Sequence, residues 1–185
     1  MQAVSKPKTS AGLLPFRIRD GQPEVLVAHM GGPFWENRDD GGWSIVKGEY
    51  DEREDAYAAA RREFEEETGA PPPQGAVLEL GEVRQPSGKR ITAWAIESDF
   101  DPSSIRSNTF TIEWPRGSGN QQQFPEIDRA EWFGAETARR KLVKGQVAFI
   151  EELERRLRET GRVTPHPPPA AAELASDPTQ ERGLP

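Results

Sequence analysis

Residues 56–73 constrain the fold more than any other stretch of this 185-residue chain. The segment from Ala56 to Thr68 consists mostly of alanine, arginine and glutamate, which favour helices, so it predicts a helix. Gly69 suits the left-handed position that follows a helix, and the prolines at 71–73 cannot continue one. A helix of defined length is therefore expected, and the rest of the fold must pack against it.

Four glutamates crowd the second half of this helix, at positions 63, 65, 66 and 67. Like charges three or four residues apart on a helix repel each other, at a cost of roughly 0.2–0.5 kcal/mol per pair. Glu63, Glu66 and Glu67 share one helix face, whereas Glu65 points away from them. Such a face is either a solvated acidic surface or an oxygen-rich site for a hard divalent cation such as Mg²⁺.

Segments on both sides of the helix have the pattern of β-strands. The apolar segments 10–18 and 24–30 flank the turn-forming pair Asp20-Gly21 and predict a hairpin. The alternating segments 76–85 and 90–98 predict a second hairpin. The remaining expectations are a short strand at 43–46, a loop at 47–55, a strand at 108–114, a long polar loop at 115–127, a strand at 129–134, and helices at 135–142 and 144–159.

The chain is expected to form one folded domain with two terminal segments. Residues 1–7 predict a flexible N-terminal arm, and residues 8–160 the domain itself. Residues 161–185 are rich in proline, alanine and small polar residues, a composition typical of a disordered tail.

The composition argues against several classes of function. A net charge of -7 is unfavourable for a protein that grips a nucleic-acid backbone, so we expect no stable nucleic-acid binding. The absence of cysteine excludes a thiolate nucleophile and a cysteine–zinc site, and it favours a cytoplasmic protein weakly. His29 and His166 lie far apart, which gives little support to a histidine zinc site or a Ser-His-Asp triad. No membrane span or secretory signal is expected, because the sequence has no long apolar run and its start has no apolar core.

The glutamate cluster belongs to a longer pattern with fixed spacing. The order is Gly48, five residues, Glu54, seven residues, Arg62-Glu63, Phe64, one residue, Glu66-Glu67, one residue and Gly69-Ala70. This pattern resembles the Nudix box, the motif of the Nudix hydrolase (MutT-like) family. At common residue frequencies, seven fixed identities coincide by chance on the order of 10⁻⁷ times per window. Phe64 and Ala70 depart mildly from the apolar residues usual there, which affects packing more than chemistry.

The resemblance implies a fold, a reaction and a cofactor. The fold is an α/β/α sandwich with a central mixed β-sheet. The reaction is hydrolysis of a nucleoside diphosphate linked to another moiety, and the cofactor is Mg²⁺ or Mn²⁺. The resemblance covers residues 8–160, although only the box is highly specific. The order of the segments is most similar to bacterial predicted NTP pyrophosphohydrolases of this superfamily.

The resemblance also implies roles for individual residues. In the family, the acids that match Glu63, Glu66 and Glu67 hold the metal, often together with the carbonyl of the glycine that matches Gly48. Arg62 matches an arginine that braces a box acid, here Glu54.

The general base in the family is sometimes a box glutamate, here Glu66 or Glu63, and sometimes an acid from a later loop. Glu113 and Glu126 are the candidates of the second kind, since each lies near an expected strand end or loop. Each of them alone is more often an ordinary solvated acid.

Further residues are candidates for contact with the substrate. Lys47, Lys89 and Arg116 lie in loops from which they can reach a phosphate, although a lone loop cation is more often solvated. Phe34 and Trp35, in a glycine-flanked loop, can stack on a base or, with equal weight, cover the core.

Three functions are compatible with the pattern. The first is a metal-dependent pyrophosphohydrolase, and the second is a non-catalytic Nudix-type nucleotide-binding or sensor module. The complete acid set favours the first, because a binding module does not need the whole metal face. The third, isopentenyl diphosphate isomerisation, uses a cysteine in the resembling proteins. The box does not choose among nucleoside triphosphates, dinucleoside polyphosphates, nucleotide sugars and ADP-ribose, since the selecting groups lie on loops outside it.

Overall fold

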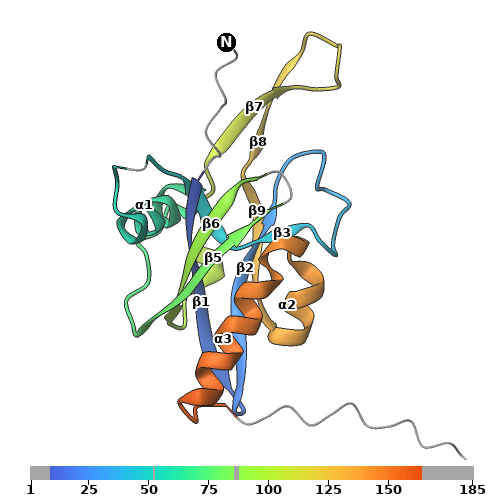
Figure 1. The fold of residues 1–185 in the computed structure, drawn as a ribbon. Helices are drawn as coiled ribbons and strands as arrows, with labels where there is room; N and C mark the ends of the chain where they lie inside the picture. The colour runs from blue at the N-terminus through green and yellow to red at the C-terminus, as the bar shows by residue number, and fades with distance from the viewer. Residues whose placement is uncertain (1–8, 52, 86–87, 164–185) are drawn as a thin grey trace, which may run out of the picture.

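A mixed β-sheet forms the centre of the molecule in the computed structural model, which describes residues 9–51, 53–85 and 88–163 (Figure 1). The strand order is β3-β2-β1-β6-β5, with β4 paired to β1 and β9 paired to β2. Strands β1 and β6 run parallel, and the other pairs in this sheet are antiparallel. The strands are β1 (Thr9–Arg19), β2 (Gln22–Met30), β3 (Trp43–Ser44), β4 (Val46–Glu49), β5 (Val77–Arg84), β6 (Arg90–Glu97) and β9 (Ile127–Gly134).

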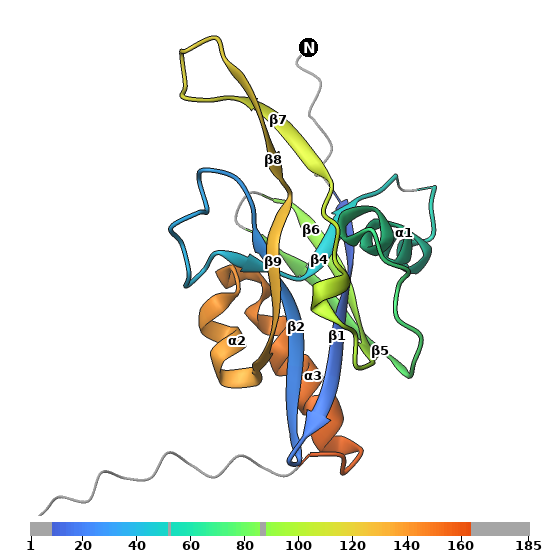
Figure 2. The same ribbon diagram turned by 180° about the vertical axis from the view of Figure 1, so that it is seen from behind.

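Helices cover both faces of the sheet (Figures 1 and 2). Helix α1 (Ala56–Thr68) packs on β1 and β4. On the other face, α2 (Ala135–Lys141) packs on β2 and β9, and α3 (Val147–Glu159) packs on β5. Two single 3₁₀ turns, η1 (Pro102–Ser104) and η2 (Lys144–Gln146), lie in the connections. The expected α/β/α sandwich with a mixed sheet is therefore confirmed.

Each face of the sheet has its own hydrophobic core. Strand β1 serves both, because alternate residues of a strand point to opposite faces: Leu13 packs in the cluster under α1, and Leu14 in the cluster under α2 and α3. This explains why β1 is apolar without interruption over most of its length. The buried helix residues are Ala59, Ala60 and Phe64 on one side, and Ala138, Phe149, Ile150, Leu153 and Leu157 on the other.

Local interactions fix both ends of α1. The Asp55 side chain accepts a hydrogen bond from the backbone N–H of Ala58 at 2.8 Å, as an N-cap residue does. Gly69 has a φ of 65° and donates its N–H to the Glu65 carbonyl at 2.8 Å. The expected helix at 56–68 is therefore confirmed, including the glycine that ends it.

Two expected loops contain strands. Strand β4 extends into the segment 47–55, where Lys47 and Gly48 pair with β1. The expected polar loop at 115–127 contains β8 (Gln121–Pro125), which pairs with β7 (Thr109–Glu113) as a two-stranded hairpin that projects from the body (Figure 2). The loop prediction was wrong for 121–125 because residues 121–123 are all exposed, so this strand lacks the apolar alternation that a buried face produces.

The terminal segments fall mostly outside the described residues, namely 1–8 and 164–185. Residues 161–163, which the sequence assigns to the tail, pack on the domain instead. Val163 is buried in the core beneath α3, and Arg162 forms an ion pair with Glu97. Within the described ranges, no helix is long and apolar enough to cross a membrane.

Candidate active site

A polar pocket of about 350 Å³ lies where α1, β4, the β5–β6 turn and the base of the β7–β8 hairpin meet. Six of the sequence-predicted site residues with acidic or basic side chains meet here, together with Gly48. The lining residues are Lys47, Gly48, Glu49, Glu63, Glu66, Glu67, Lys89, Asn108 and Glu126. All four expected metal ligands therefore line one pocket.

Gly48 allows β4 to approach α1 closely. A β-carbon added at Gly48 would lie 1.6 Å from Oε2 of Glu63 and 2.1 Å from its Cδ, far inside contact distance. Glu63 is itself only 9% exposed. Burial raises the pKa of the Glu63 carboxyl, and the hydrogen bond from Arg62 opposes this rise. The close approach therefore places the Gly48 backbone directly beside a carboxylate of the cluster.

Arg62 connects three of the acids. Its Nε and Nη2 donate to the two carboxylate oxygens of Glu54, each at 2.9 Å. Its Nη1 donates to Oε1 of Glu63 at 2.7 Å and to Oε2 of Glu66 at 2.9 Å. These bonds raise the pKa of Arg62 above its usual range and lower the pKa of Glu54. The contact expected between Arg62 and Glu54 is present, and the same guanidinium also offsets repulsion between Glu63 and Glu66.

Glu67 and Lys47 form the enclosed side of the pocket. Oε2 of Glu67 accepts the backbone N–H of Lys47 at 3.3 Å. Burial raises the pKa of Glu67 to about 7, a rise that the charge of Lys47 opposes and that of Glu126 increases. Burial also lowers the pKa of the Lys47 ammonium group. A carboxyl group in a pocket whose pKa is shifted by burial and by charged neighbours is a candidate functional group.

The acids do not converge on a single point in this structure. Among residues 9–51, 53–85 and 88–163, no three acidic, histidine or cysteine side chains lie close enough together to hold a metal ion as they stand. The guanidinium of Arg62, hydrogen-bonded to Glu63 and Glu66, supplies the positive charge there. The donor set nevertheless suits Mg²⁺ or Mn²⁺ chemically, because it consists of carboxylate and carbonyl oxygens.

The two later acids lie in different places. Glu126 lines the pocket, and its backbone is held by hydrogen bonds from its N–H to the Asn108 carbonyl (2.8 Å) and from the Gly31 N–H to its carbonyl (2.9 Å). Glu113 lies on β7, where its Oε1 accepts the Gly119 N–H at 2.8 Å within the hairpin. Of these two acids, only Glu126 reaches the pocket.

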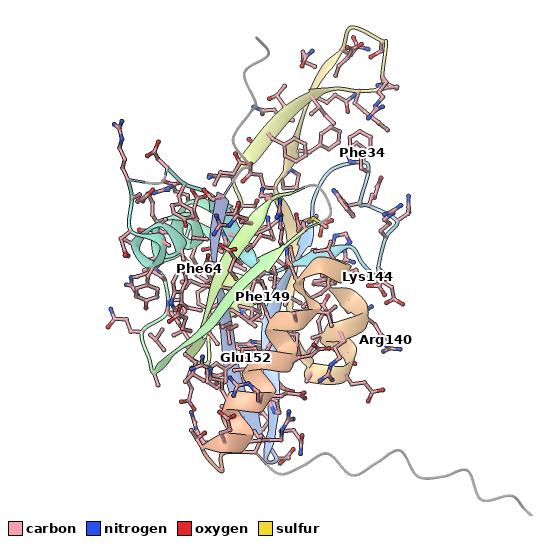
Figure 3. All side chains as sticks on the ribbon, viewed as in Figure 1. Phe34, Phe64, Arg140, Lys144, Phe149 and Glu152 are labelled. Carbon is pink, nitrogen blue, oxygen red and sulfur yellow. The ribbon has the colours of Figure 1, made fainter. Side chains whose placement is uncertain are left out.

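The expected aromatic contacts lie outside the lining residues, in the loop 31–42 beside the hairpin. Phe34 is 47% exposed, and its ring packs edge-on to Trp114 with centroids 5.4 Å apart. The guanidinium carbon of Arg116 lies 5.1 Å from the Phe34 centroid, and that of Arg38 lies 5.6 Å from the Trp35 ring. Figure 3 shows Phe34 at the surface near the hairpin, in contrast to Phe64 within the body.

Some residues of the site carry no recognisable signal in the sequence. Glu49 and Asn108 line the pocket although each is an unremarkable polar residue at the edge of a strand. Glu49 accepts a hydrogen bond from Nζ of Lys89 at 3.3 Å, which brings the β5–β6 turn to the pocket. The pairing of β4 with β1, and of β1 with β6, brings Glu49 and Lys89 together, and a hydrogen bond from the Glu126 N–H holds Asn108 beside them.

Comparison with known families identifies the chain. The model of the NUDIX domain matches residues 6–153, most of its length. The chain belongs to the Nudix family. This Nudix protein is therefore classed with the Nudix pyrophosphohydrolases. A search of curated proteins finds no match.

Solved structures support the fold of this Nudix protein. A Caenorhabditis elegans Ap4A hydrolase in a binary complex has a TM-score of 0.56 and 19% identity over 82% of this chain and 98% of that one. The NUDIX domain of Shewanella oneidensis NrtR, complexed with ADP ribose, has a TM-score of 0.54 and 19% identity. The match covers 83% of this chain and 90% of that one. A MutT/nudix family protein from Listeria innocua has a TM-score of 0.53 and 18% identity. The match covers 84% of this chain and 98% of that one. At these identities the likeness concerns the fold alone, so the bacterial subgroup stays a prediction.

Proposed function

We propose that this Nudix protein hydrolyses a phosphoanhydride bond in a nucleoside diphosphate linked to another group, such as a nucleoside triphosphate or a dinucleoside polyphosphate. The observation that supports this most is the shared pocket of Gly48, Glu63, Glu66 and Glu67. The proposed compartment is the cytoplasm, in keeping with the absence of cysteine.

The proposed metal ligands are the carboxylates of Glu63, Glu66 and Glu67 and the carbonyl oxygen of Gly48. A bound Mg²⁺ or Mn²⁺ ion supplies positive charge that stabilises these carboxylates and the negative charge on the substrate phosphates. Arg62 then keeps its two hydrogen bonds to Glu54, which fix the start of the helix relative to the loop before it.

The proposed reaction is attack of water on a phosphorus atom, with one carboxylate accepting the proton of that water. The accepting group must lie within hydrogen-bond reach of the water. Glu66, Glu63 and Glu126 are the candidates, because all three line the pocket. Lys47 and Lys89, also in the lining, are proposed to contact the substrate phosphates.

Two of the structural neighbours support a nucleotide substrate. The C. elegans protein is named as an Ap4A hydrolase, and the S. oneidensis domain is described as complexed with ADP ribose. Ap4A and ADP ribose both contain phosphoanhydride bonds, the class of bond that is proposed here as the one cleaved.

A panel of nucleotides tests the proposal. We expect the purified protein to release phosphate or pyrophosphate from at least one compound of the panel in the presence of Mg²⁺, and to release none with EDTA. E66Q and E67Q should remove this turnover and keep the circular dichroism spectrum, whereas E65Q, altered on the exposed face of α1, should keep both. Binding of a nucleotide by calorimetry without turnover of any compound would instead support the non-catalytic binding module.

A further inference from the structure

His29, at the end of β2, is fully buried and has an oxygen partner at each ring nitrogen. Nδ1 lies 2.8 Å and 2.9 Å from the two carboxylate oxygens of Asp128. Nε2 lies 2.7 Å from the backbone carbonyl oxygen of Arg38. The ring therefore joins three segments: β2, β9 and the loop 31–42.

These partners limit which hydrogen bonds the ring can make. A neutral imidazole has one N–H, so one of its nitrogens would turn a lone pair toward an oxygen. The Arg38 carbonyl can only accept, and the Asp128 side chain is 28% exposed. Arg129, whose Nη1 lies 3.4 Å from Oδ1 of Asp128, and Asp39, which accepts from the indole of Trp43 against the ring edge, are charged neighbours of the ring. A small cavity on another side of the ring is lined by Lys47, Glu67 and Glu126. An imidazolium, with both nitrogens donating, satisfies every contact.

Asp128 occupies an irregularity in the pairing of β2 with β9. His29 is paired with Arg129, whereas the next residue, Met30, is paired with Ile127. Asp128 is thus the extra residue of a β-bulge. Because a shift of one residue turns every side chain to the opposite face of a strand, the bulge determines where the preceding residues point. Ile127 is buried, and Glu126 reaches the active-site pocket.

The loop 31–42 closes over the same point. Met30 donates its N–H to the Gly42 carbonyl at 3.0 Å, and Gly31 donates to the Glu126 carbonyl at 2.9 Å. A β-carbon at Gly42 would lie 2.1 Å from the Arg38 carbonyl oxygen, the atom that His29 holds. The histidine therefore contacts the loop 31–42, whose first residue, Gly31, is hydrogen-bonded to the backbone of Glu126.

We propose that His29 is a positioning residue for the active site. As an imidazolium it holds Asp128 in the bulge, and thereby keeps Glu126 directed into the pocket beside Lys47 and Glu67. Its effect on turnover rests on the proposed hydrolase function, in which Glu126 is one of the three candidates for the group that accepts the proton of the attacking water.

Nitrogen NMR of the full chain tests the protonation without any substrate. The chain has two histidines, so H166Q leaves His29 as the sole source of imidazole signals. At about pH 7.5 we expect both ring nitrogens of His29 to resonate in the protonated range, each with a directly bonded proton. A signal from an unprotonated ring nitrogen would overturn the assignment.

A double-mutant cycle tests the positioning. D128N replaces the carboxylate by an amide of the same shape, and we expect it to lower kcat about tenfold with little change in KM. In an E126Q background, D128N should cause no further loss, because its effect passes through Glu126. If D128N lowers kcat by the same factor in the E126Q background as in the wild type, Asp128 acts independently of Glu126. That result would overturn the proposal.

D99N is the matched control, since Asp99 is an exposed aspartate that pairs with Arg17 away from the pocket. It should leave kcat unchanged. If the wild-type protein turns over no nucleotide, the hydrolase function and the effect of His29 on turnover both fail. The NMR experiment still decides whether the buried ion pair with Asp128 exists.

Discussion

The backbone of Gly48 touches the carboxylate of Glu63 so closely that a β-carbon at Gly48 would lie 1.6 Å from Oε2. The crowding atoms belong to the end of a flexible side chain, so the carboxylate rather than the sheet must give way. G48A is therefore expected to keep its fold and to lose activity about 100-fold or more, since displacement of a reacting group by about 1 Å costs that much. Steady-state kinetics and a thermal melt measure the two effects.

Gly134 provides the control for this substitution. It has no neighbouring atom within 4 Å of an added β-carbon, and its φ of -61° suits any residue. G134A should match the wild type in both assays. Full activity of G48A would show that the close approach of β4 to Glu63 is unnecessary.

The forked contact of Arg62 with Glu54 predicts that lysine cannot replace this arginine. A lysine keeps the charge but cannot donate two parallel hydrogen bonds to one carboxylate while also reaching Glu63 and Glu66. We expect R62K to lower kcat/KM by about tenfold or more. Because the side chain of Arg62 is 38% exposed, the change in stability should be small, within about 1 kcal/mol.

R61K is the matched control on the same helix. The guanidinium of Arg61 lies 6.0 Å from the Tyr57 ring, and it should be replaceable by lysine with little effect on kcat/KM. Equal losses in R61K and R62K would mean that the helix, and not the forked contact, responds to the substitution.

Neutralising Glu67 is expected to stabilise the metal-free protein at high pH. The folded state raises the pKa of Glu67 from 4.5 to about 7, so folding favours the protonated acid. The wild type therefore loses free energy of unfolding as the pH rises from about 4.5 through 7, and E67Q does not. We expect an advantage for E67Q on the order of 2 kcal/mol at about pH 8, and less than half of that at about pH 5. Urea denaturation in EDTA measures both values.

Adding Mg²⁺ should reverse this order. A ligand that binds only the folded state stabilises it by about 2.7 kcal/mol at 100 times its Kd, and E67Q lacks one proposed ligand. E65Q should follow the wild type throughout, since Glu65 is exposed and points away from the pocket. A wild type that is insensitive to Mg²⁺ would argue against a metal site at these glutamates.

The contrast between Phe34 and Phe64 separates substrate contact from packing. Phe34 is 47% exposed, so F34A should change stability by no more than about 0.5 kcal/mol. If Phe34 stacks on a base, F34A raises KM about tenfold with kcat unchanged. Phe64 is fully buried under the sheet, and F64A should cost about 3–5 kcal/mol. An unchanged KM in F34A would assign the exposed ring to another role.

The sequence predicts the helix and its acidic face well because their signals are local. The alanine, arginine and glutamate content of residues 56–68, together with Gly69, predicts a helix with a defined end, and the structure has it at 56–68. Strand β1, continuous and apolar, is equally evident. In both cases the residues that determine the element are neighbours in the sequence.

The contacts that the sequence does not predict depend on distant partners or on exposed strands. His29 and Asp128 are 99 positions apart, and nothing in either segment singles out the other. The choice between Glu113 and Glu126 depends on the β7–β8 hairpin, whose exposed glutamines have no apolar pattern. The binding of Arg62 to three acids at once depends on side-chain conformations that the spacing alone leaves open.

The β7–β8 hairpin has a mechanical consequence. Its strands run from Thr109 paired with Pro125 to Glu113 paired with Gln121, and the residues just before and after them, Asn108 and Glu126, line the active-site pocket. A movement of the hairpin would therefore displace the two lining residues at its base. An antibody fragment selected against the turn at 115–120, which does not line the pocket, is therefore expected to change kcat through the positions of Asn108 and Glu126.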